Sequence, residues 1–190
     1  MVKILHVFNT ISSLRERYYA ASTGKQSLIK ILSEAEIAEQ VYNSNAIENN
    51  TLTLEETEKI LLQKSLDRYV TEREIYEAKN LSRVVSYIDT RAKEQELTLE
   101  IILLLHKILI SNIRDDIAGR FRKDDEWVRV GNHIAPDPKE VVKRLEKMLA
   151  AYNASSNENI IKRIALLHLT FEHTHPFVDG NGRIGRAINN

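Results

Sequence analysis

The sequence predicts an all-α fold, a helical bundle that carries one short β-hairpin. Apolar residues recur at three- and four-residue intervals through most of the chain, which is the pattern of amphipathic helices. The chain has only 6 glycines and 3 prolines among its 190 residues, so few positions interrupt a helix. Residues 127–134 instead alternate apolar and polar side chains around Gly131-Asn132, which indicates a hairpin.

The composition excludes several classes of protein. Basic and acidic residues balance at 27 each, so the overall charge indicates neither a nucleic-acid partner nor an anionic membrane. The absence of cysteine excludes disulfides and thiolate metal sites and fits a reducing compartment, so we expect a cytoplasmic protein. The longest apolar run, residues 101–110, is too short to cross a bilayer, and residues 1–8 show no cleavage site.

Two helices are expected before residue 50. The first runs from about Ile11, and Gly24 can end it. The second runs from Ser27 to about Glu48 and can end in a left-handed conformation at Asn49 or Asn50. Its apolar residues at helical spacing are Leu28, Ile31, Leu32, Ala35, Ala38 and Val41.

Three helices are expected between residues 54 and 113. Thr53 and Glu56 can form a capping box for a helix that ends near Gln63. A longer helix follows over about 72–93, and Thr98 can cap a third helix that ends near residue 113. His106 is expected on the flank of that third helix, as an ordinary helix residue without chemistry.

The C-terminal part is expected to contain the hairpin and three further helices. Asp137 as the N-cap and Pro138 in the first turn open a helix to about residue 152, and a polar loop follows over 154–157. The next helix covers residues 159 to about 175, because Pro176 disfavours the α conformation at the residue before it. A last helix can restart over 183–190. The residues expected to face inward from the 138–152 helix are Val141, Val142, Leu145, Met148 and Leu149.

The segment from His175 to Arg186 concentrates the chemistry of the chain. It reads His-Pro-Phe-Val-Asp-Gly-Asn-Gly-Arg-Ile-Gly-Arg, with a candidate base, a carboxylate, close glycines and two arginines. Glycines before a helix N-terminus leave backbone N–H groups accessible to an anion. Arg183 and Arg186 share a helix face, about 4.5 Å apart along the axis, and their guanidinium groups suit a polyphosphate. Asp179 beside them suits Mg²⁺ bound to phosphate oxygens.

This segment resembles the signature of the Fic family, HPFx[DE]GNGRxxR, at every fixed position. The resemblance implies a transferase that moves AMP from ATP to a hydroxyl group of a target protein. It also implies the roles of individual residues: His175 is the general base, and Asp179 is the Mg²⁺ ligand. The nucleotide is bound by Gly180, Asn181, Gly182, Arg183 and Arg186. The bland alternative is a helix–turn–helix with a buried histidine and solvated arginines.

Ser44-Asn45-Ala46-Ile47-Glu48-Asn49 resembles the inhibitory motif of the same family, [ST]xxxE[GN]. In related proteins the glutamate pairs with the second arginine of the signature, which is Arg186 here. Ser44, Glu48 and Asn49 are therefore the expected inhibitory residues. A carboxylate offers a guanidinium the same forked geometry as a phosphate, so Glu48 would leave ATP in an unreactive pose. The alternative is a solvated charge at a helix end.

Two more segments resemble the family. Gly119-Arg120-Phe121-Arg122 is similar to its G-x-[YF]-R segment, and we expect these arginines to support the active-site region without acting in catalysis. The hairpin corresponds to the flap that receives the target as an added strand. The target-binding residues implied are Val128, Arg129, Val130, Gly131, Asn132, His133 and Ile134. A surface hairpin without a binding role is the alternative.

The resemblance implies a domain organisation for the whole chain. Residues 1–26 form an N-terminal extension, 27–50 the inhibitory helix packed on the core, and 51–190 the Fic domain. Fic domains usually continue beyond the position of Asn190, so we expect a truncated C-terminal end.

The expected partners are a nucleoside triphosphate and an unidentified target protein, without nucleic acid or membrane, and a homo-oligomer is compatible with the sequence. The alternatives left open are AMP removal, transfer of another nucleotide, a non-catalytic nucleotide-sensing module, and a toxin.

Overall fold

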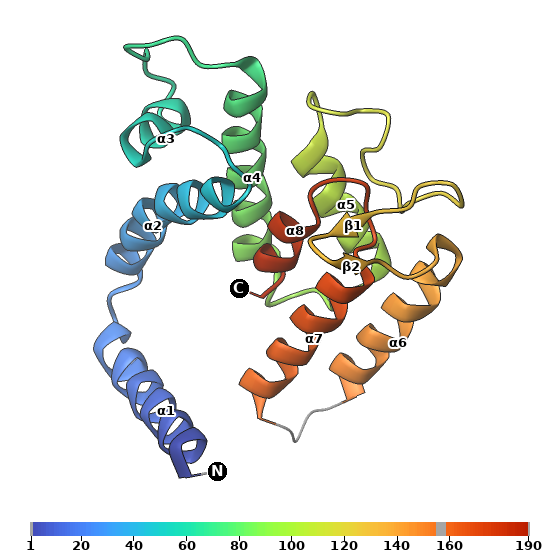
Figure 1. Ribbon diagram of the computed structural model, residues 1–190. Helices are drawn as coiled ribbons and strands as arrows, with labels where there is room; N and C mark the ends of the chain where they lie inside the picture. Colours follow the sequence, from blue (N-terminus) through green and yellow to red (C-terminus); the bar gives the residue numbers. More distant parts are fainter. Residues whose placement is uncertain (1, 155–158, 190) are drawn as a thin grey trace. The chain divides into compact units, whose positions relative to one another are not determined.

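The computed structural model describes residues 2–154 and 159–189, and these residues are mostly helical (Figure 1). The described part contains eight α-helices, one 3₁₀ helix and one two-stranded antiparallel sheet. This confirms the predicted all-α fold with a single hairpin. The chain divides into two compact units, residues 1–37 and 38–190. None of the described helices is long and apolar enough to span a membrane.

The first unit is helical, and the side chains described in it form no buried core. Helix α1 (Val2–Ser22) begins at Val2, so the predicted start near Ile11 was wrong; no capping residue marks the observed start in the sequence. Helix α2 (Gln26–Ile47) begins in this unit and continues into the second. None of the side chains described between residues 7 and 37 is buried. The spacing of Leu28, Ile31 and Leu32 therefore predicted the helix but not burial, because all three are more than half exposed.

The second half of α2 enters the core of the second unit. Its buried side chains are Ala38, Val41 and Asn45. The helix ends at Ile47, and Asn49 takes a left-handed conformation with φ of 65°. The predicted left-handed end is therefore confirmed, and the chain turns sharply immediately after Glu48.

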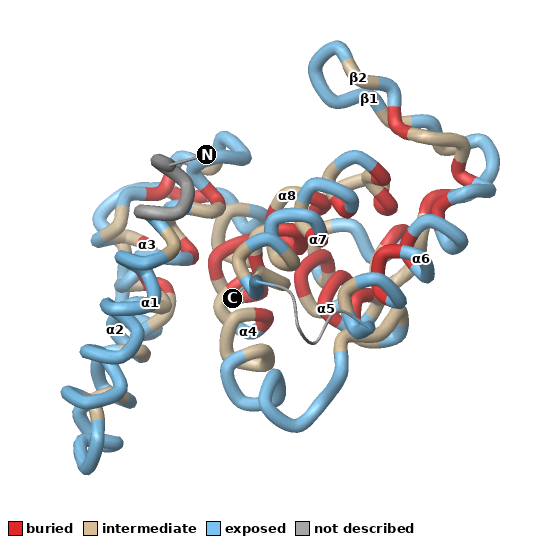
Figure 2. Tube along the Cα trace, turned by 90° about the horizontal axis from the view of Figure 1, so that it is seen from below, coloured by how far each residue is buried: buried red, intermediate tan, exposed pale blue. Residues whose placement is uncertain are grey.

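Helices α3 (Leu54–Leu61) and α4 (Glu72–Arg91) both start with a capping box. Thr53 and Glu56 form the one predicted for α3, and Thr71 and Glu74 form a second one at α4. Helix α5 (Leu99–Ile110) is capped by Thr98 as predicted but ends at Ile110, short of the predicted residue 113. The α4 and α5 helices pack against each other and carry much of the buried surface, drawn in red in Figure 2.

The hairpin forms where it was predicted. Strands β1 (Arg129–Val130) and β2 (His133–Ile134) pair antiparallel, with Arg129 opposite Ile134. Gly131 in the connecting turn has φ of 57°, a conformation that glycine adopts without strain. Figure 2 shows the two strands mostly in the pale blue of exposed residues.

The chain then enters α6 through a tighter turn than predicted. Asp137 caps a 3₁₀ helix, η1 (Pro138–Glu140), which leads into α6 (Val141–Ala154). Val142 is 43% exposed, so it does not face inward as expected, whereas the other four predicted residues are buried. Ala154 ends α6, and the rest of the predicted polar loop, 155–157, lies outside the described residues.

Two C-terminal helices complete the second unit. Helix α7 (Ile160–Thr174) packs along α6, as Figure 1 shows, and a loop joins it to α8 (Asn181–Ala187). The predicted start of the last helix at Arg183 was two residues late, because Gly180 in a left-handed conformation (φ 81°) is already its N-cap. The core that carries these helices contains Ala78, Leu81, Val84, Ile102, Leu105, Leu109, Leu145, Leu167, Phe171, Phe177 and Ile184.

Candidate active site

His175 lies at the C-terminal end of α7, where the helix gives way to the loop before α8. Its backbone is left-handed, with φ of 47° and ψ of 63°, and its N–H still bonds to Phe171 O at 2.9 Å. Pro176 explains why the helix stops here, because a proline disfavours the α region at the preceding residue. The prediction that α7 ends at His175 is confirmed, and the side chain leaves the helix at its last turn.

The imidazole of His175 is held in one tautomer. Its Nδ1 lies 3.3 Å from the carbonyl oxygen of Glu172, and a carbonyl only accepts, so Nδ1 carries the hydrogen. The Nε2 atom then has a free lone pair. Burial lowers the pKa of His175 below its ordinary value, outweighing the opposite effect of the bond to Glu172. The ring is therefore a neutral proton acceptor near pH 7.

A second titratable group lies behind this ring. The carboxylate of Glu172 is 4.0 Å from His175 Nδ1, and burial raises the pKa of Glu172. The same carboxylate lies against α8, because a Cβ built on Gly185 would be 2.1 Å from Glu172 Oε1. A side chain at position 185 would therefore displace the Glu172 carboxylate from its place between α7 and α8.

The loop between His175 and α8 is fixed by its own side chains. Asn181 accepts a bond from Phe177 N and donates one to Phe177 O, both at 2.8 Å. Asn181 is only 2% exposed, so its side chain stabilises the loop. Any contact of this residue with a nucleotide would have to be made by its backbone. Phe177 is completely buried, which agrees with its expected role as an apolar anchor.

Asp179 projects from this loop among cationic groups. Its Oδ1 accepts bonds from Gly180 N at 2.6 Å and from Arg183 at 3.2 Å, and its Oδ2 lies 3.5 Å from Arg73. The carboxylate is 32% exposed and can be approached from solvent. Among the described residues, no group of three or more metal-ligating side chains gathers anywhere. A single accessible carboxylate still fits Mg²⁺, which keeps several waters and takes its other ligands from substrate phosphates.

The two signature arginines differ in their surroundings, although they were expected to share one helix face. Arg183 is 2% exposed and lies between Asp179 and Glu77, whose carboxylate is 3.4 Å away. These two acids draw the guanidinium beneath the loop. Within the described residues its buried Nε and Nη1 have no hydrogen-bond partner, so both remain unused donors that a ligand oxygen can accept from.

Arg186 faces the end of α2. It donates to Ser44 Oγ at 2.9 Å, to the carbonyl of Ser44 at 3.0 Å and to Glu48 Oε1 at 2.7 Å. The expected pairing of Glu48 with Arg186 is therefore present, and Ser44 adds two bonds that the sequence did not predict. A cavity of about 250 Å³ lies beside this contact, and its polar lining is Gln40, Asn43, Ser44, Arg183 and Arg186.

Glu48 also covers the first turn of α8. A Cβ built on Gly182 would lie 2.4 Å from Glu48 Oε1 and 2.9 Å from Arg186 Nη1. The carboxylate thus occupies the space directly over this glycine, where an anion would approach the backbone. Sequence reasoning missed this contact, because Gly182 carries no side chain that indicates a neighbour.

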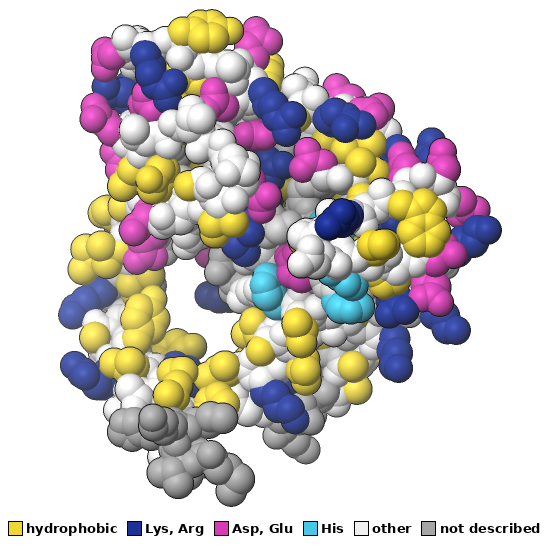
Figure 3. Space-filling view, in the orientation of Figure 1, with side chains coloured by type: hydrophobic (Ala, Val, Ile, Leu, Met, Phe, Trp, Pro, Cys, Tyr) yellow, Lys and Arg dark blue, Asp and Glu magenta, His cyan; other side chains and the backbone are white. Residues whose placement is uncertain are grey.

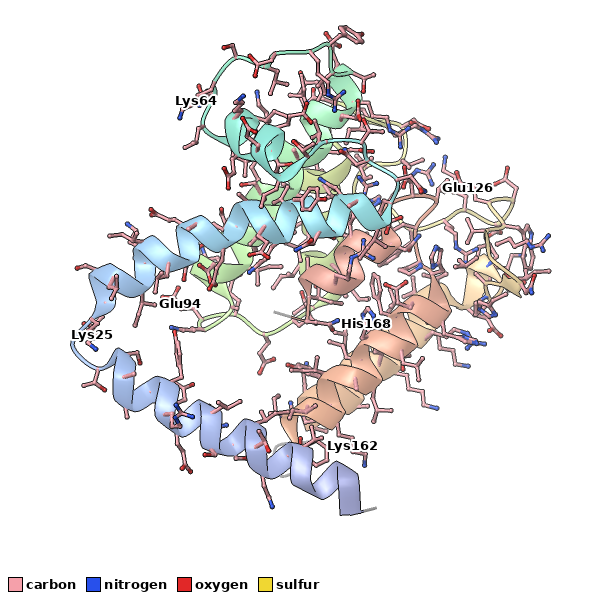
Figure 4. The ribbon with its side chains drawn as sticks, turned by 60° about the vertical axis from the view of Figure 1, so that its left-hand side comes forward. Lys25, Lys64, Glu94, Glu126, Lys162 and His168 are labelled. Atoms are coloured by element: carbon pink, nitrogen blue, oxygen red, sulfur yellow. The ribbon has the colours of Figure 1, made fainter. Side chains whose placement is uncertain are left out.

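The segment 119–122 supports the end of α7. The buried guanidinium of Arg122 donates to His175 O at 2.8 Å, to Pro136 O at 2.9 Å and to Glu126 O at 3.0 Å. Arg120 pairs with the side chain of Glu126, which Figure 4 labels. The expectation that these arginines support the site agrees with these contacts.

Arg122→Met is expected to lower the free energy of unfolding by about 3 kcal/mol, because several buried carbonyls would lose their donor. Chemical denaturation measures the loss. Arg144→Met is the matched control, since it removes an exposed ion pair with Glu140 and should cost under about 1 kcal/mol. Equal losses in the two variants would contradict the supporting role of Arg122.

The hairpin lies close to the end of α7. His133 Nε2 is 3.2 Å from the carbonyl of His173, and the two imidazole rings are 4.3 Å apart. Figure 3 shows histidine side chains, in cyan, at the surface of this region. Val130 and Ile134 are 43% and 65% exposed, so the hairpin presents apolar side chains to solvent within reach of the site.

His106 is the functional-site residue that the sequence analysis placed wrongly. It was expected on the flank of its helix, but it is completely buried. Its ring stacks on Phe177 with centroids 3.7 Å apart, and burial lowers its pKa to about 4. The signal available in the sequence was weak: a histidine in the middle of an apolar run has to find partners elsewhere in the fold.

His168, in contrast, is the hydrogen-bonded helix histidine that was expected. It projects from α7 toward α8, as its label in Figure 4 shows, and its Nδ1 lies 3.2 Å from the carbonyl of Gly185.

Known proteins resemble this chain along nearly its whole length. Two relatives named protein adenylyltransferase Fic, from Drosophila willistoni and Nematostella vectensis, are 28% and 29% identical over 96% and 97% of the chain. The alignments cover 39% and 43% of those relatives, so the chain spans about two fifths of their length.

Solved structures share the fold. A crystal structure of a Fic family protein from Desulfovibrio desulfuricans matches 98% of this chain and 55% of its own, with a TM-score of 0.84 and 28% identity. A Fic domain containing signaling protein from Bacteroides thetaiotaomicron matches 95% of this chain and 70% of its own, with a TM-score of 0.83 and 26% identity. The Fic/DOC family profile itself matches residues 96–190, which include the hairpin and the whole segment from His175 to Arg186. The chain therefore belongs to the Fic/DOC family.

Proposed function

We propose that this protein is an adenylyltransferase that transfers AMP from ATP to a hydroxyl group of a target protein. The names of its relatives support this reaction class. The observation that carries the proposal is the neutral imidazole of His175, with its free Nε2, at the start of the loop that leads to Asp179, Arg183 and Arg186. A proton acceptor, a metal-binding carboxylate and two cations thus meet within twelve residues.

The reaction is a displacement at the α-phosphorus. The oxygen of the target hydroxyl forms a bond to this phosphorus, while the bond from phosphorus to the bridging oxygen of the β-phosphate breaks and pyrophosphate leaves. The hydroxyl proton passes to His175 Nε2, and the carbonyl of Glu172 keeps the opposite nitrogen protonated. The resulting imidazolium lies near the carboxylate of Glu172, which favours its positive charge.

Asp179 is the residue that would hold Mg²⁺. When bound, the ion neutralises charge on the phosphate oxygens and on the leaving pyrophosphate. The Oδ2 atom of Asp179 would exchange the long contact to Arg73 for the ion, while Oδ1 keeps its bond to Gly180 N, and the partial exposure of the carboxylate allows the exchange.

Arg183 and Arg186 are the proposed partners of the terminal phosphates. Arg183 has two donor atoms without a hydrogen-bond partner among the described residues, and both arginines line the cavity beside α2. In the same proposal Glu48 restrains the enzyme, because it takes up Arg186 and covers Gly182. The hairpin receives the target as an added strand, which its exposed edge near His175 supports.

Labelling tests the function directly. The protein is incubated with ATP labelled on the α-phosphate and with a cell lysate, and labelled proteins are identified by mass spectrometry. Label on protein supports the transfer, whereas label that appears on no protein, also after substitution of Glu48, overturns it. Release of AMP from an AMPylated protein would instead assign removal of the group, the alternative reaction of the same site.

The rate of transfer should depend on pH through His175. The base works only in its neutral form, and its pKa lies below the ordinary value of 6.5. Lowering the pH through this depressed pKa protonates Nε2 and removes activity. At pH 6.5, where an ordinary histidine is half protonated, the single-turnover rate should therefore still exceed half of its maximum. An acidic limb centred above pH 6.5 would contradict this assignment.

A further inference from the structure

His106 of α5 contacts the loop between α7 and α8, and each of its two ring nitrogens has a hydrogen-bond partner. Gly119 N lies 3.0 Å from Nδ1, and the carbonyl oxygen of Asp179 lies 3.1 Å from Nε2. The partners are 13 and 73 residues away in sequence. A single side chain on α5 thus joins the segment 119–122 to the loop that carries Asp179.

The two partners define the tautomer. A backbone N–H only donates, so Nδ1 must accept from Gly119 and carries no hydrogen. The hydrogen of the neutral ring is therefore on Nε2, which donates it to the carbonyl of Asp179. The opposite tautomer would place two donors against each other at Gly119 and two acceptors against each other at Asp179.

Packing fixes the position of the His106 ring, in addition to its hydrogen bonds. The imidazole is parallel to Phe177 within 1°, at 3.7 Å between centroids. A Cβ built on Gly180 would lie 3.6 Å from His106 Cδ2 and 3.1 Å from both Leu109 and Ile110. Helix α5 therefore packs directly against the backbone of the loop at Gly180.

The peptide between Asp179 and Gly180 is held from both sides. Its carbonyl accepts from His106, and its N–H donates to the Asp179 carboxylate at 2.6 Å. A peptide group is planar, so fixing the carbonyl also fixes the direction of the N–H. That N–H in turn selects the orientation of the carboxylate. Without the bond from His106 this peptide can rotate, because Gly180 tolerates both signs of φ.

We propose that His106 is a positioning residue: by donating its Nε2 hydrogen to the carbonyl of Asp179, it aims the Asp179 carboxylate at the metal ion that accompanies the nucleotide. This inference rests on the proposed function, which makes Asp179 the metal-binding carboxylate. His106 itself touches neither substrate nor metal.

A matched pair of variants separates this role from simple packing. His106→Gln places an amide donor near the position of Nε2, whereas His106→Asn reaches only the position of Nδ1 and can serve Gly119 alone. Both variants lose the ring and its stacking on Phe177, so their losses of melting temperature should be similar. His168→Asn is the control, because it removes another helix histidine that bonds to a carbonyl away from Asp179.

Isothermal titration of the full chain with ATP, at a series of Mg²⁺ concentrations and in EDTA, provides a readout that does not depend on transfer. The Mg²⁺ concentration for half-maximal enhancement of ATP binding should rise about 3- to 10-fold in His106→Asn, the range for one lost hydrogen bond. This Mg²⁺ concentration should stay within about twofold of the wild-type value in His106→Gln and in His168→Asn. The first variant keeps an amide donor to Asp179 O, and the second keeps His106 itself. Binding in EDTA should be equal in all of them.

The outcomes are distinct. Equal Mg²⁺ requirements for the Gln and Asn variants would overturn the positioning role while leaving the proposed function intact. A wild-type chain that shows no Mg²⁺-dependent binding of ATP would overturn the proposed metal site itself. Nitrogen-15 spectra of the wild-type histidines give an independent check if the variants do not fold: the Nε2–H tautomer of His106 supports the inference, and the Nδ1–H tautomer overturns it.

Discussion

His175→Ala is expected to lower the rate of AMP transfer by about 10²- to 10⁴-fold, the range for loss of a positioned general base. The loss should appear in kcat, because the imidazole takes up a proton only as the hydroxyl attacks. Affinity for ATP, measured by titration calorimetry, should change little, since the proposed phosphate contacts are made by other residues. Single-turnover measurement with labelled ATP gives the chemical rate.

A lower transfer rate could also result from a disturbed α7 helix, so the experiment needs a control for this effect. His168→Gln is a suitable control, because His168 lies on the same helix and bonds to Gly185 O without facing the loop. Its transfer rate should stay close to wild type. A His175→Ala variant that transfers AMP at the wild-type rate would remove His175 from the chemistry.

Glu48→Gln and Glu48→Gly are expected to raise the rate of AMP transfer or self-modification. The bond from Arg186 to the Glu48 carboxylate is charge-assisted and contributes about 1.5–3 kcal/mol, which corresponds to an increase of about 10- to 100-fold when it is released. The glycine variant also clears the space over Gly182, so its effect should be the larger one. Labelled ATP, with and without a target lysate, measures the gain.

Two comparisons make this prediction specific. Glu39→Gln changes an exposed glutamate on the same helix and should leave the rate unchanged. In an Arg186→Ala background, the Glu48 substitutions should have little further effect, since both residues act through one contact. No gain from either Glu48 variant under any nucleotide or target condition would remove the regulatory role.

The helices were predictable, and so were those of their ends that carry a local signal. Thr53 with Glu56 and the Asn49 left-handed end each depend on neighbours a few residues away, and both formed as predicted. The pairing of Glu48 with Arg186 spans 138 positions, and it was expected only through the family resemblance. No spacing rule connects two segments so far apart.

The two errors of burial at the site have a common physical origin in tertiary packing. The burial of His106 depends on Gly119 and Asp179, which are distant in sequence. The burial of Arg183 depends on Glu77, a residue of α4 that reads as an ordinary surface acid of a mixed-charge helix. In both cases the periodicity gives the helix correctly, while the partner that decides the burial lies on another element.

The three hydrogen bonds that hold Arg186 go to Ser44, in the last turn of α2, and to Glu48, just after the helix ends. Helix termini unwind more readily than helix centres, and such local opening needs far less free energy than global unfolding. Fraying of a single turn would thus free the guanidinium without any displacement of the bundle. A neighbouring chain that contacts this turn, or a modification of the Ser44 hydroxyl, would change the stability of the turn. It would thereby change how often Arg186, which is distant in sequence, is released.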